Sequence, residues 1–127
     1  MRATILIVEH DADMSAQFTT LLEGEGYAVD VATDHHTALA YLRHGPPPRL
    51  ILLSLALSAP DGWQFLAARR ADAALARIPV IALSPAGKAL RPAAVAVGAD
   101  DLLGEPVDRG ALLAAAARYR QGLGRAS

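Results

Sequence analysis

The sequence predicts a single α/β domain in which five parallel strands alternate with helices. Three observations lead to this prediction. Five short apolar runs recur along the 127 residues, segments with helical spacing of apolar residues separate them, and Gly, Pro and Asp residues stand at the junctions. Near-continuous apolar runs suit parallel strands that are buried on both faces. We therefore expect a doubly wound (βα)5 sheet in three layers, with helices on both sides.

The apolar runs give the expected strands. Each is short, as strands of such sheets are, and the last is weaker than the others because it contains fewer apolar residues. The expected strands are Thr4 to Val8, Ala28 to Ala32, Leu50 to Leu53, Pro79 to Leu83 and Asp101 to Leu103.

Between these runs, apolar residues recur three or four positions apart, as on one face of a helix. Pro92 fits only in a first helical turn, which makes the fourth helix short. Gly45 and the prolines after it end the second helix, and Asp61 and Asp108 are expected to cap the third and fifth. The expected helices are Met14 to Glu25, His35 to His44, Gly62 to Arg70, Ala93 to Val97 and Leu112 to Tyr119.

Composition excludes several kinds of protein. A hydrophobic content of 53% argues against disorder, and a net charge of -1 gives no basic surface for nucleic acid or an anionic membrane. The absence of cysteine excludes disulfides and thiolate metal sites and is compatible with a reducing cytosol. No signal peptide and no stretch long enough to span a bilayer is evident. We expect a cytoplasmic domain over residues 1–120 and a flexible tail over residues 121–127.

Polar residues follow the ends of four expected strands. In a flavodoxin-like sheet, whose strand order is 2-1-3-4-5, ligands bind beyond the carboxyl ends of the strands, where the winding direction reverses. The sequence therefore predicts a pocket there. The residues expected to line it are Glu9, His10, Asp11, Ser54, Ser84 and Glu105.

The pattern of these residues resembles the receiver domain of bacterial two-component response regulators. The resemblance extends from Thr4 to about Arg120 and implies the flavodoxin-like fold, a place in a phosphorelay, and partners such as a histidine kinase or another regulator. It also implies a cis peptide bond between Glu105 and Pro106. The residues that carry it are Ile5-Leu6-Ile7-Val8-Glu9-His10-Asp11, Ser54, Pro60-Asp61-Gly62, Ser84, Gly98-Ala99-Asp100-Asp101 and Glu105-Pro106.

Several positions depart from that family pattern. Receiver domains hold an acidic pair that binds magnesium, an aspartate that accepts a phosphoryl group, a Ser or Thr, and a lysine. Glu9 matches the first acid and Ser84 matches the hydroxyl residue. His10 stands in place of the second acid, Ser54 in place of the phosphoacceptor and Glu105 in place of the lysine. The resemblance therefore implies a pseudo-receiver, in which the phosphorylation pocket is degenerate.

These replacements weaken each step of phosphotransfer. Magnesium is usually held through carboxylates, so its binding is expected to be weak or absent, and we expect no other cofactor. A serine such as Ser54 needs an activating base and cannot form an acyl phosphate. The charge of Glu105 would repel an incoming phosphoryl group. Leu102 replaces the family's switch aromatic. We expect a phosphorylation-independent interaction module and not an enzyme.

The family's dimer and output face consists of the fourth helix, the fifth strand and the fifth helix. In this chain that face is rich in small and aliphatic residues, some of which must belong to the core. An exposed remainder would suit a homodimer or a docked signalling partner. The residues concerned are Leu90, Ala93, Ala94, Val97, Leu102, Leu112 and Leu113.

Two alternatives remain open. The pocket could sense a ligand or pH, because negative charge around His10 would favour its protonated form. Ser54, His10 and either Glu9 or Asp11 also supply the residue types of a hydrolase site, although no Gly-x-Ser-x-Gly elbow or oxyanion hole accompanies them. The simpler interpretation makes Ser54 a small residue hydrogen-bonded to backbone or water, and His10 a structural imidazole.

Overall fold

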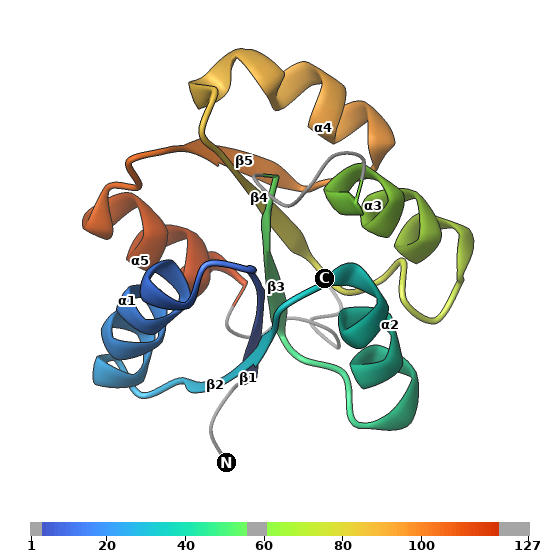
Figure 1. Ribbon diagram of the computed structural model, residues 1–127, viewed down its shortest axis with the longest axis horizontal. Coiled ribbons are helices and arrows are strands. Elements are labelled where there is room, and N and C mark those ends of the chain that lie inside the picture. Colours follow the sequence, from blue (N-terminus) through green and yellow to red (C-terminus); the bar gives the residue numbers. More distant parts are fainter. Residues whose placement is uncertain (1–3, 56–60, 120–127) are drawn as a thin grey trace.

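The computed structural model describes residues 4–55 and 61–119. Within these ranges five parallel strands form one sheet in the order β2-β1-β3-β4-β5, with helices on both faces (Figure 1). This order confirms the predicted doubly wound fold. The proposed tail at residues 121–127 and the segment 56–60 after the third strand lie outside the described residues.

The strands lie close to their predicted positions. Every residue of β3 and β4 is buried, as expected for central strands of a parallel sheet. β3 and β4 each include one serine that the prediction left outside, and β5 extends one residue further. The strands are β1 (Thr4–Val8), β2 (Ala28–Ala32), β3 (Leu50–Ser54), β4 (Val80–Ser84) and β5 (Asp101–Gly104).

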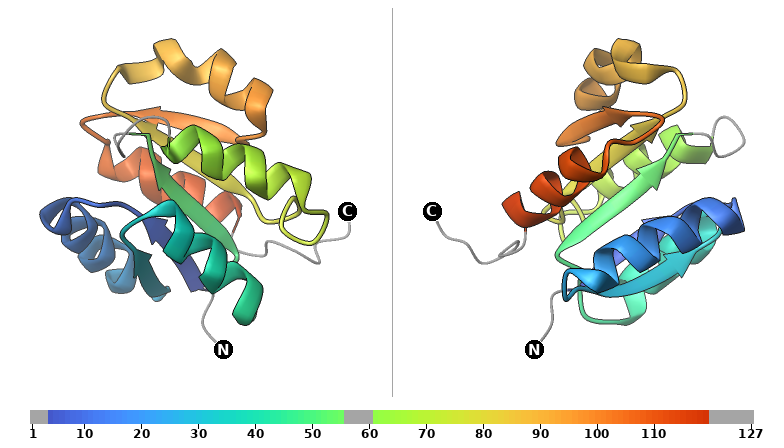
Figure 2. Two further views of the ribbon diagram at one scale, coloured as in Figure 1. Left: turned by 45° about the vertical axis from the view of Figure 1, so that its right-hand side comes forward. Right: turned by 90° about the vertical axis from the view of Figure 1, so that its left-hand side faces the viewer.

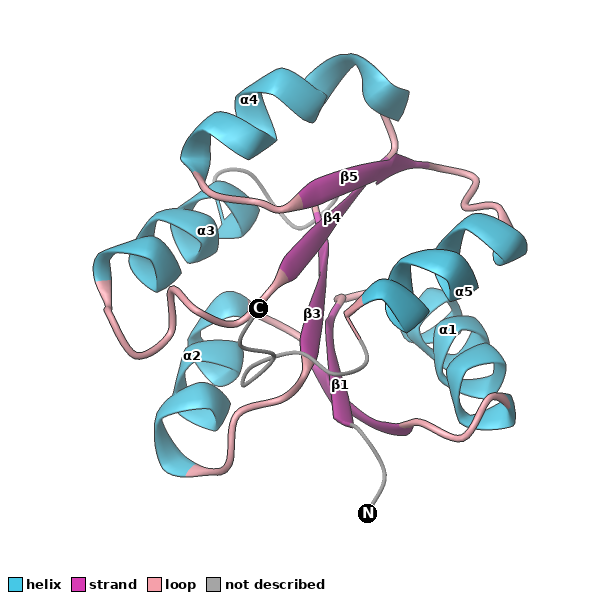
Figure 3. Cartoon of the chain, turned by 180° about the vertical axis from the view of Figure 1, so that it is seen from behind, coloured by secondary structure: helices cyan, strands magenta, loops and turns pink. Residues whose placement is uncertain are grey.

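The helices divide between the two faces of the sheet. α1 and α5 lie on one side and α2 and α3 on the other (Figure 3). α4 belongs to the second side, because Ala94 packs in the same hydrophobic cluster as Phe65 and Leu66 of α3. The helices are α1 (Ala12–Gly24), α2 (His35–His44), α3 (Asp61–Ala71), α4 (Arg91–Val97) and α5 (Arg109–Arg118).

Some helices begin earlier than predicted, because their caps lie further upstream than the first apolar residue. Asp11 caps α1, and its Oδ1 accepts hydrogen bonds from the amides of Asp13 and Met14. Asp108 caps α5 as predicted, accepting a hydrogen bond from Ala111 N at 2.8 Å. Asp61 is not outside α3 as the prediction required. It is the first residue of that helix, where its negative charge is still favourable.

α4 is also longer than predicted. Pro92 lies in its first turn, as expected, but the helix begins at Arg91 and follows a 3₁₀ helix, η1 (Gly87–Leu90). Gly98 ends α4 with a φ of 117°, in the left-handed region that favours glycine. The segment between β4 and β5 is therefore almost continuously helical.

Candidate functional site

The sheet brings the predicted pocket residues to one edge. Val8 pairs with Leu53 across β1 and β3, so Glu9 follows β1 beside the end of β3, where Ser54 lies. Ser84 pairs with Gly104 at the end of β5, and Glu105 comes next. Polar side chains at the ends of four neighbouring strands therefore converge at the edge where the sheet reverses its winding.

We call this edge the crevice, and three of the predicted pocket residues there are buried. Ser54 and Ser84 are 0% exposed and Glu9 is 2% exposed. Ser84 Oγ accepts a hydrogen bond from Ala86 N at 3.1 Å, within the loop that leads to η1. The two hydroxyl groups therefore form part of the packed interior.

Glu9 is tied to its own loop. Its Oε2 accepts a hydrogen bond from the Asp11 amide at 3.0 Å. The same oxygen lies 3.4 Å from Nδ1 of His10, whose side chain is 53% exposed. His10 thus faces solvent at the rim, with one ring nitrogen toward Glu9.

Asp11 does not line the pocket as predicted. Its side chain turns to the start of α1 and caps that helix, and the residue is exposed. Asp11 follows the acidic position and precedes a helix, and both features fit an N-cap. Its capping role was therefore readable from the sequence.

Glu105 follows β5 at the same edge. Its amide donates to Ser84 O at 2.8 Å, and the peptide bond to Pro106 is cis, as the resemblance implied. Oε2 is buried and has no hydrogen-bond partner in the described part of the chain. Burial, together with the nearby charge of Glu9, raises the pKa of the Glu105 carboxyl group. Glu105 takes part in none of the ion pairs formed by the described residues.

Few candidate oxygen ligands for magnesium are grouped at this edge. Across residues 4–55 and 61–119, no three His, Asp or Glu side chains are grouped so that they could hold a metal ion. Glu9 and Asp11 direct oxygens to backbone amides, and Ser54 supplies no carboxylate. Magnesium prefers octahedral oxygen coordination, and the carboxylates that lie close together at this edge in the described residues are those of Glu9 and Glu105.

The predicted interaction face is only partly a surface. Ala94, Leu102 and Leu112 are at most 2% exposed and belong to the core, which corrects their assignment to this face. They are buried because α4 and α5 turn these residues toward the sheet. Leu90, Val97 and Leu113 are partly buried, and Ala93 is exposed.

Charged residues cross the same face. Asp101 at the start of β5 lies 3.0 Å from Arg91 Nε of α4 and 3.8 Å from Arg118 Nη1 of α5. Burial alone would raise the pKa of Asp101, but hydrogen bonds from Leu102 and Arg91 and the two positive charges lower it. Asp101 thus links the three elements.

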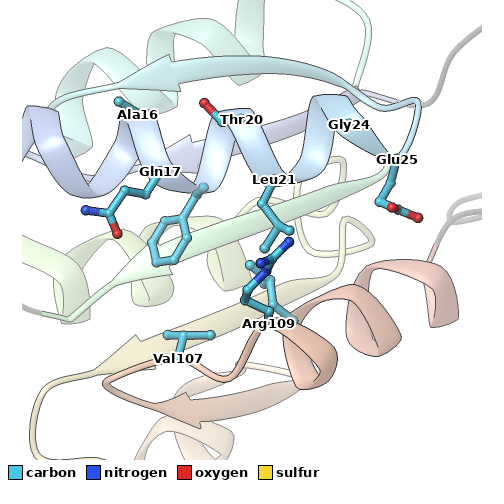
Figure 4. A pocket seen from close by; sticks show the side chains of 10 residues that line it. Ala16, Gln17, Thr20, Leu21, Gly24, Glu25, Val107 and Arg109 are labelled. Atoms are coloured by element: carbon cyan, nitrogen blue, oxygen red, sulfur yellow. The ribbon is translucent and has the colours of Figure 1, made fainter.

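A groove that sequence reasoning missed lies between α1 and α5. It has a volume of about 600 Å³ and is lined mainly by α1 and by the start of α5. Leu21 of α1 and Arg109 of α5 face each other across it (Figure 4). Only the pairing of two helices distant in sequence creates this groove, so no local pattern reveals it.

Arg69 is a second feature that was missed. It is 4% exposed and donates hydrogen bonds to the carbonyl groups of Ile78 and Gly98. The signal was present in the sequence, because Arg69 follows the buried Phe65 by four positions and therefore lies on the same helix face.

No helix in the described ranges is long and apolar enough to cross a membrane.

Comparisons with known proteins agree with this geometry. The family model of the response regulator receiver domain matches residues 5–117. The alkaline phosphatase synthesis transcriptional regulatory protein SphR of Synechococcus elongatus is 34% identical over 111 residues, which cover 80% of this chain and 42% of SphR. The signal receiver domain of a histidine kinase from Syntrophus aciditrophicus is 26% identical, with a TM-score of 0.83 over 98% of this chain and 95% of that chain.

A receiver domain of a Francisella response regulator shares the fold, with a TM-score of 0.83 at 22% identity over 94% of this chain and 98% of that chain. The chain spans less than half the length of the curated relatives that it matches. The family match covers nearly the whole described fold. The chain therefore belongs to the response regulator receiver domain family of two-component signalling.

Proposed function

We propose that this receiver domain works without phosphorylation, as a protein–protein interaction module within a two-component pathway. The observation that carries the proposal is the replacement of the phosphoryl-handling groups at the strand ends. Ser54 ends β3 as a fully buried hydroxyl, and Glu105 brings a carboxylate next to Glu9. The crevice keeps its fold but has the wrong chemistry for an acyl phosphate.

Electrostatics support this proposal. A phosphoryl group carries negative charge, and stabilising it requires positive groups or backbone donors. The described crevice instead holds two carboxylates, and the pKa of one of them, Glu105, is raised by burial and by the charge of the other, Glu9. An anion entering there would add a third negative charge in a poorly solvated place. We therefore propose that magnesium and phosphate bind weakly or not at all.

Burial argues against catalysis by Ser54. A nucleophile must reach its substrate, and Ser54 is 0% exposed. His10, the histidine of the loop after β1, lies at the exposed rim with its Nδ1 toward Glu9. We propose that the domain binds partners and does not turn over a substrate.

Two surfaces could serve such binding. One is the exposed part of the α4–β5–α5 face, which includes Ala93 and Val95, the latter 42% exposed. The other is the groove between α1 and α5, where apolar walls lie beside Arg109. We propose other signalling proteins as partners, a histidine kinase or another regulator among them, and a homodimer through the first surface.

Amide NMR spectra of the labelled chain test the proposal. Spectra are recorded with and without magnesium, and then with acetyl phosphate and magnesium together. We expect the amide signals around Glu9, Ser54, Ser84 and Glu105 to stay in place, because nothing there binds the ion or accepts the phosphoryl group. Saturable shifts of these signals on adding magnesium and acetyl phosphate would contradict the proposal.

A further inference from the structure

α4 is too short to be stable without contacts to neighbouring elements. It has seven residues, and Leu90 at its N-cap position supplies no side-chain hydrogen bond. Helices this short are not stable alone in water, so neighbouring elements must hold α4 in place. Burial of apolar side chains stabilises α4 only modestly, since Ala94 is its one buried residue. Polar contacts at the ends of α4 therefore contribute a large share of its stability.

The side chain of Arg69 reaches from α3 to the end of α4. Its Nη1 donates to the carbonyl of Gly98, which ends α4, at 2.9 Å. Its Nε donates to Ile78 O at 3.0 Å, and its Nη2 donates to Ala76 O at 3.1 Å. One guanidinium group thus joins the end of α4 to the connection between α3 and β4.

The buried charge of Arg69 is compensated. Oδ2 of Asp100 lies 3.6 Å from Nη2 of Arg69 and also accepts a hydrogen bond from Val80 N at 2.8 Å. Burial lowers the pKa of Arg69, and Asp100 opposes that shift. Because Arg69 is almost completely buried, removing it would leave carbonyl groups without donors in the interior.

Arg70, the next residue, makes a parallel contact from the surface. Its Nη1 donates to Ala96 O in the last turn of α4 at 2.6 Å. Both arginines therefore place positive charge at the C-terminal end of α4, where unpaired carbonyl groups and the helix dipole favour it. Figure 2 shows α4 lying alongside α3, from which both side chains come.

We propose that Arg69 and Arg70 form a clamp that holds the C-terminal end of α4 against α3, so that the exposed surface of α4 is permanently formed. A partner that docks on Ala93 and Val95 then meets a helix that is already ordered and need not order it on binding. The clamp lies away from the crevice at the strand ends. It therefore acts whether or not that crevice accepts a phosphoryl group, and the proposal goes beyond the proposed function.

Hydrogen–deuterium exchange of the whole chain tests the clamp. Arg69→Met and Arg70→Met each remove the donors at similar side-chain length. Arg43→Met is the matched control, because the Arg43 side chain on α2 is 52% exposed and its ion pair, with Asp72 at 4.0 Å, does not involve α4. We expect amides of α4 to exchange at least about tenfold faster in the clamp variants. Amides of β3, which report global unfolding, should keep the wild-type rate in Arg70→Met and Arg43→Met.

Two results would overturn the proposal. One is wild-type exchange of the α4 amides in Arg70→Met and in folded Arg69→Met. The other is acceleration of α4 and β3 by the same factor, which would show general destabilisation and no local clamp. Should Arg69→Met fail to fold, Arg70→Met decides alone, because its side chain is exposed and reaches only the α4 end.

Discussion

Glu105 lies near enough to Glu9 for the charge of Glu9 to contribute to the raised pKa of the Glu105 carboxyl group. Glu9 is 2% exposed, and in the described structure Oε2 of Glu105 is buried without a hydrogen-bond partner. Two carboxylates thus lie close together at this edge, where the resemblance to receiver domains implies a carboxylate and a lysine. Their repulsion is present in the resting fold, so it has consequences for stability as well as for binding.

Glu105→Gln should make the protein more stable at neutral and alkaline pH. The folded-state pKa of Glu105 is raised above its ordinary value of 4.5, so the folded protein favours the protonated carboxyl group. Folding stability therefore falls as pH rises through the raised pKa and the group ionises. Glutamine cannot ionise and escapes that loss. Because the carboxylate is partly solvated, the gain should stay below about 1 kcal/mol.

Urea unfolding of wild type and Glu105→Gln between pH 4 and pH 8 measures this effect. The difference in the free energy of unfolding should be small at the acidic end and should grow with pH. Glu23→Gln, at an exposed position on α1, is the control and should show no such trend. A difference that stays constant or shrinks as pH rises would refute the account of this pair.

Asp101→Asn should have the opposite pH dependence. The pKa of Asp101 is lowered from 3.8, so its contribution to stability is present at neutral pH and is lost as pH falls through the lowered value. The variant should lose roughly 0.5–1.5 kcal/mol at pH 7, because contacts with Arg91 and Arg118 weaken. Thermal unfolding at pH 7 and at pH values stepped down to pH 2 tests this, because the lower end must pass below the lowered pKa. Equal losses at pH 7 and at the lower end would show that the ion pairs contribute nothing.

Gly104→Ala should displace η1 or destabilise the domain. A Cβ at Gly104 would lie 2.9 Å from Cα of Gly87, a backbone atom that cannot turn aside. We expect a loss of roughly 1–3 kcal/mol in urea unfolding, as for overpacked interiors. Gly24→Ala is the control, because a Cβ there meets nothing within 4 Å and alanine favours the helix. Similar stability of the two variants would rule out a tight contact at Gly104.

A homodimer through the α4–β5–α5 face should be sensitive to Val95. A concentration series by light scattering should show a reversible dimer, and Val95→Glu should raise its dissociation constant at least about tenfold by placing a charge on the apolar contact. Ala40→Glu, at an exposed position on α2 outside this face, should leave it unchanged. Monomer at every concentration, or a dimer that tolerates Val95→Glu, would remove this part of the proposal.

The fold could be predicted from the sequence because the apolar runs, the helical spacing and the turn residues all indicate the same elements. The apolar runs of β1, β3 and β4 are nearly continuous, and Gly45 and Asp108 mark the end of α2 and the start of α5. Errors occur where local signals are weak. α4 was predicted too short, because Pro92 obscured its first turn and the preceding 3₁₀ helix has no apolar periodicity.

The candidate site was predicted less completely, since side-chain direction depends on tertiary contacts. Asp11 was predicted to line the pocket because it follows Glu9 and His10 in the sequence. In the structure its carboxylate instead accepts hydrogen bonds from amides at the start of α1, which have no partner within the helix. Ala94, Leu102 and Leu112 were included in an interaction face of which a part was expected to be core, because small and aliphatic residues do not reveal which way a short helix or an edge strand turns. Arg69 was missed because charge was equated with exposure.

Intact-mass measurement after incubation with acetyl phosphate and magnesium tests the central claim most directly. A variant carrying His10→Asp, Ser54→Asp and Glu105→Lys restores the family's residue types at the three replaced positions and serves as the positive control. We predict that wild type keeps its mass while the triple variant gains the mass of one phosphoryl group. A magnesium-dependent gain of one phosphoryl group by the wild-type chain would contradict the claim that its pocket no longer performs phosphotransfer.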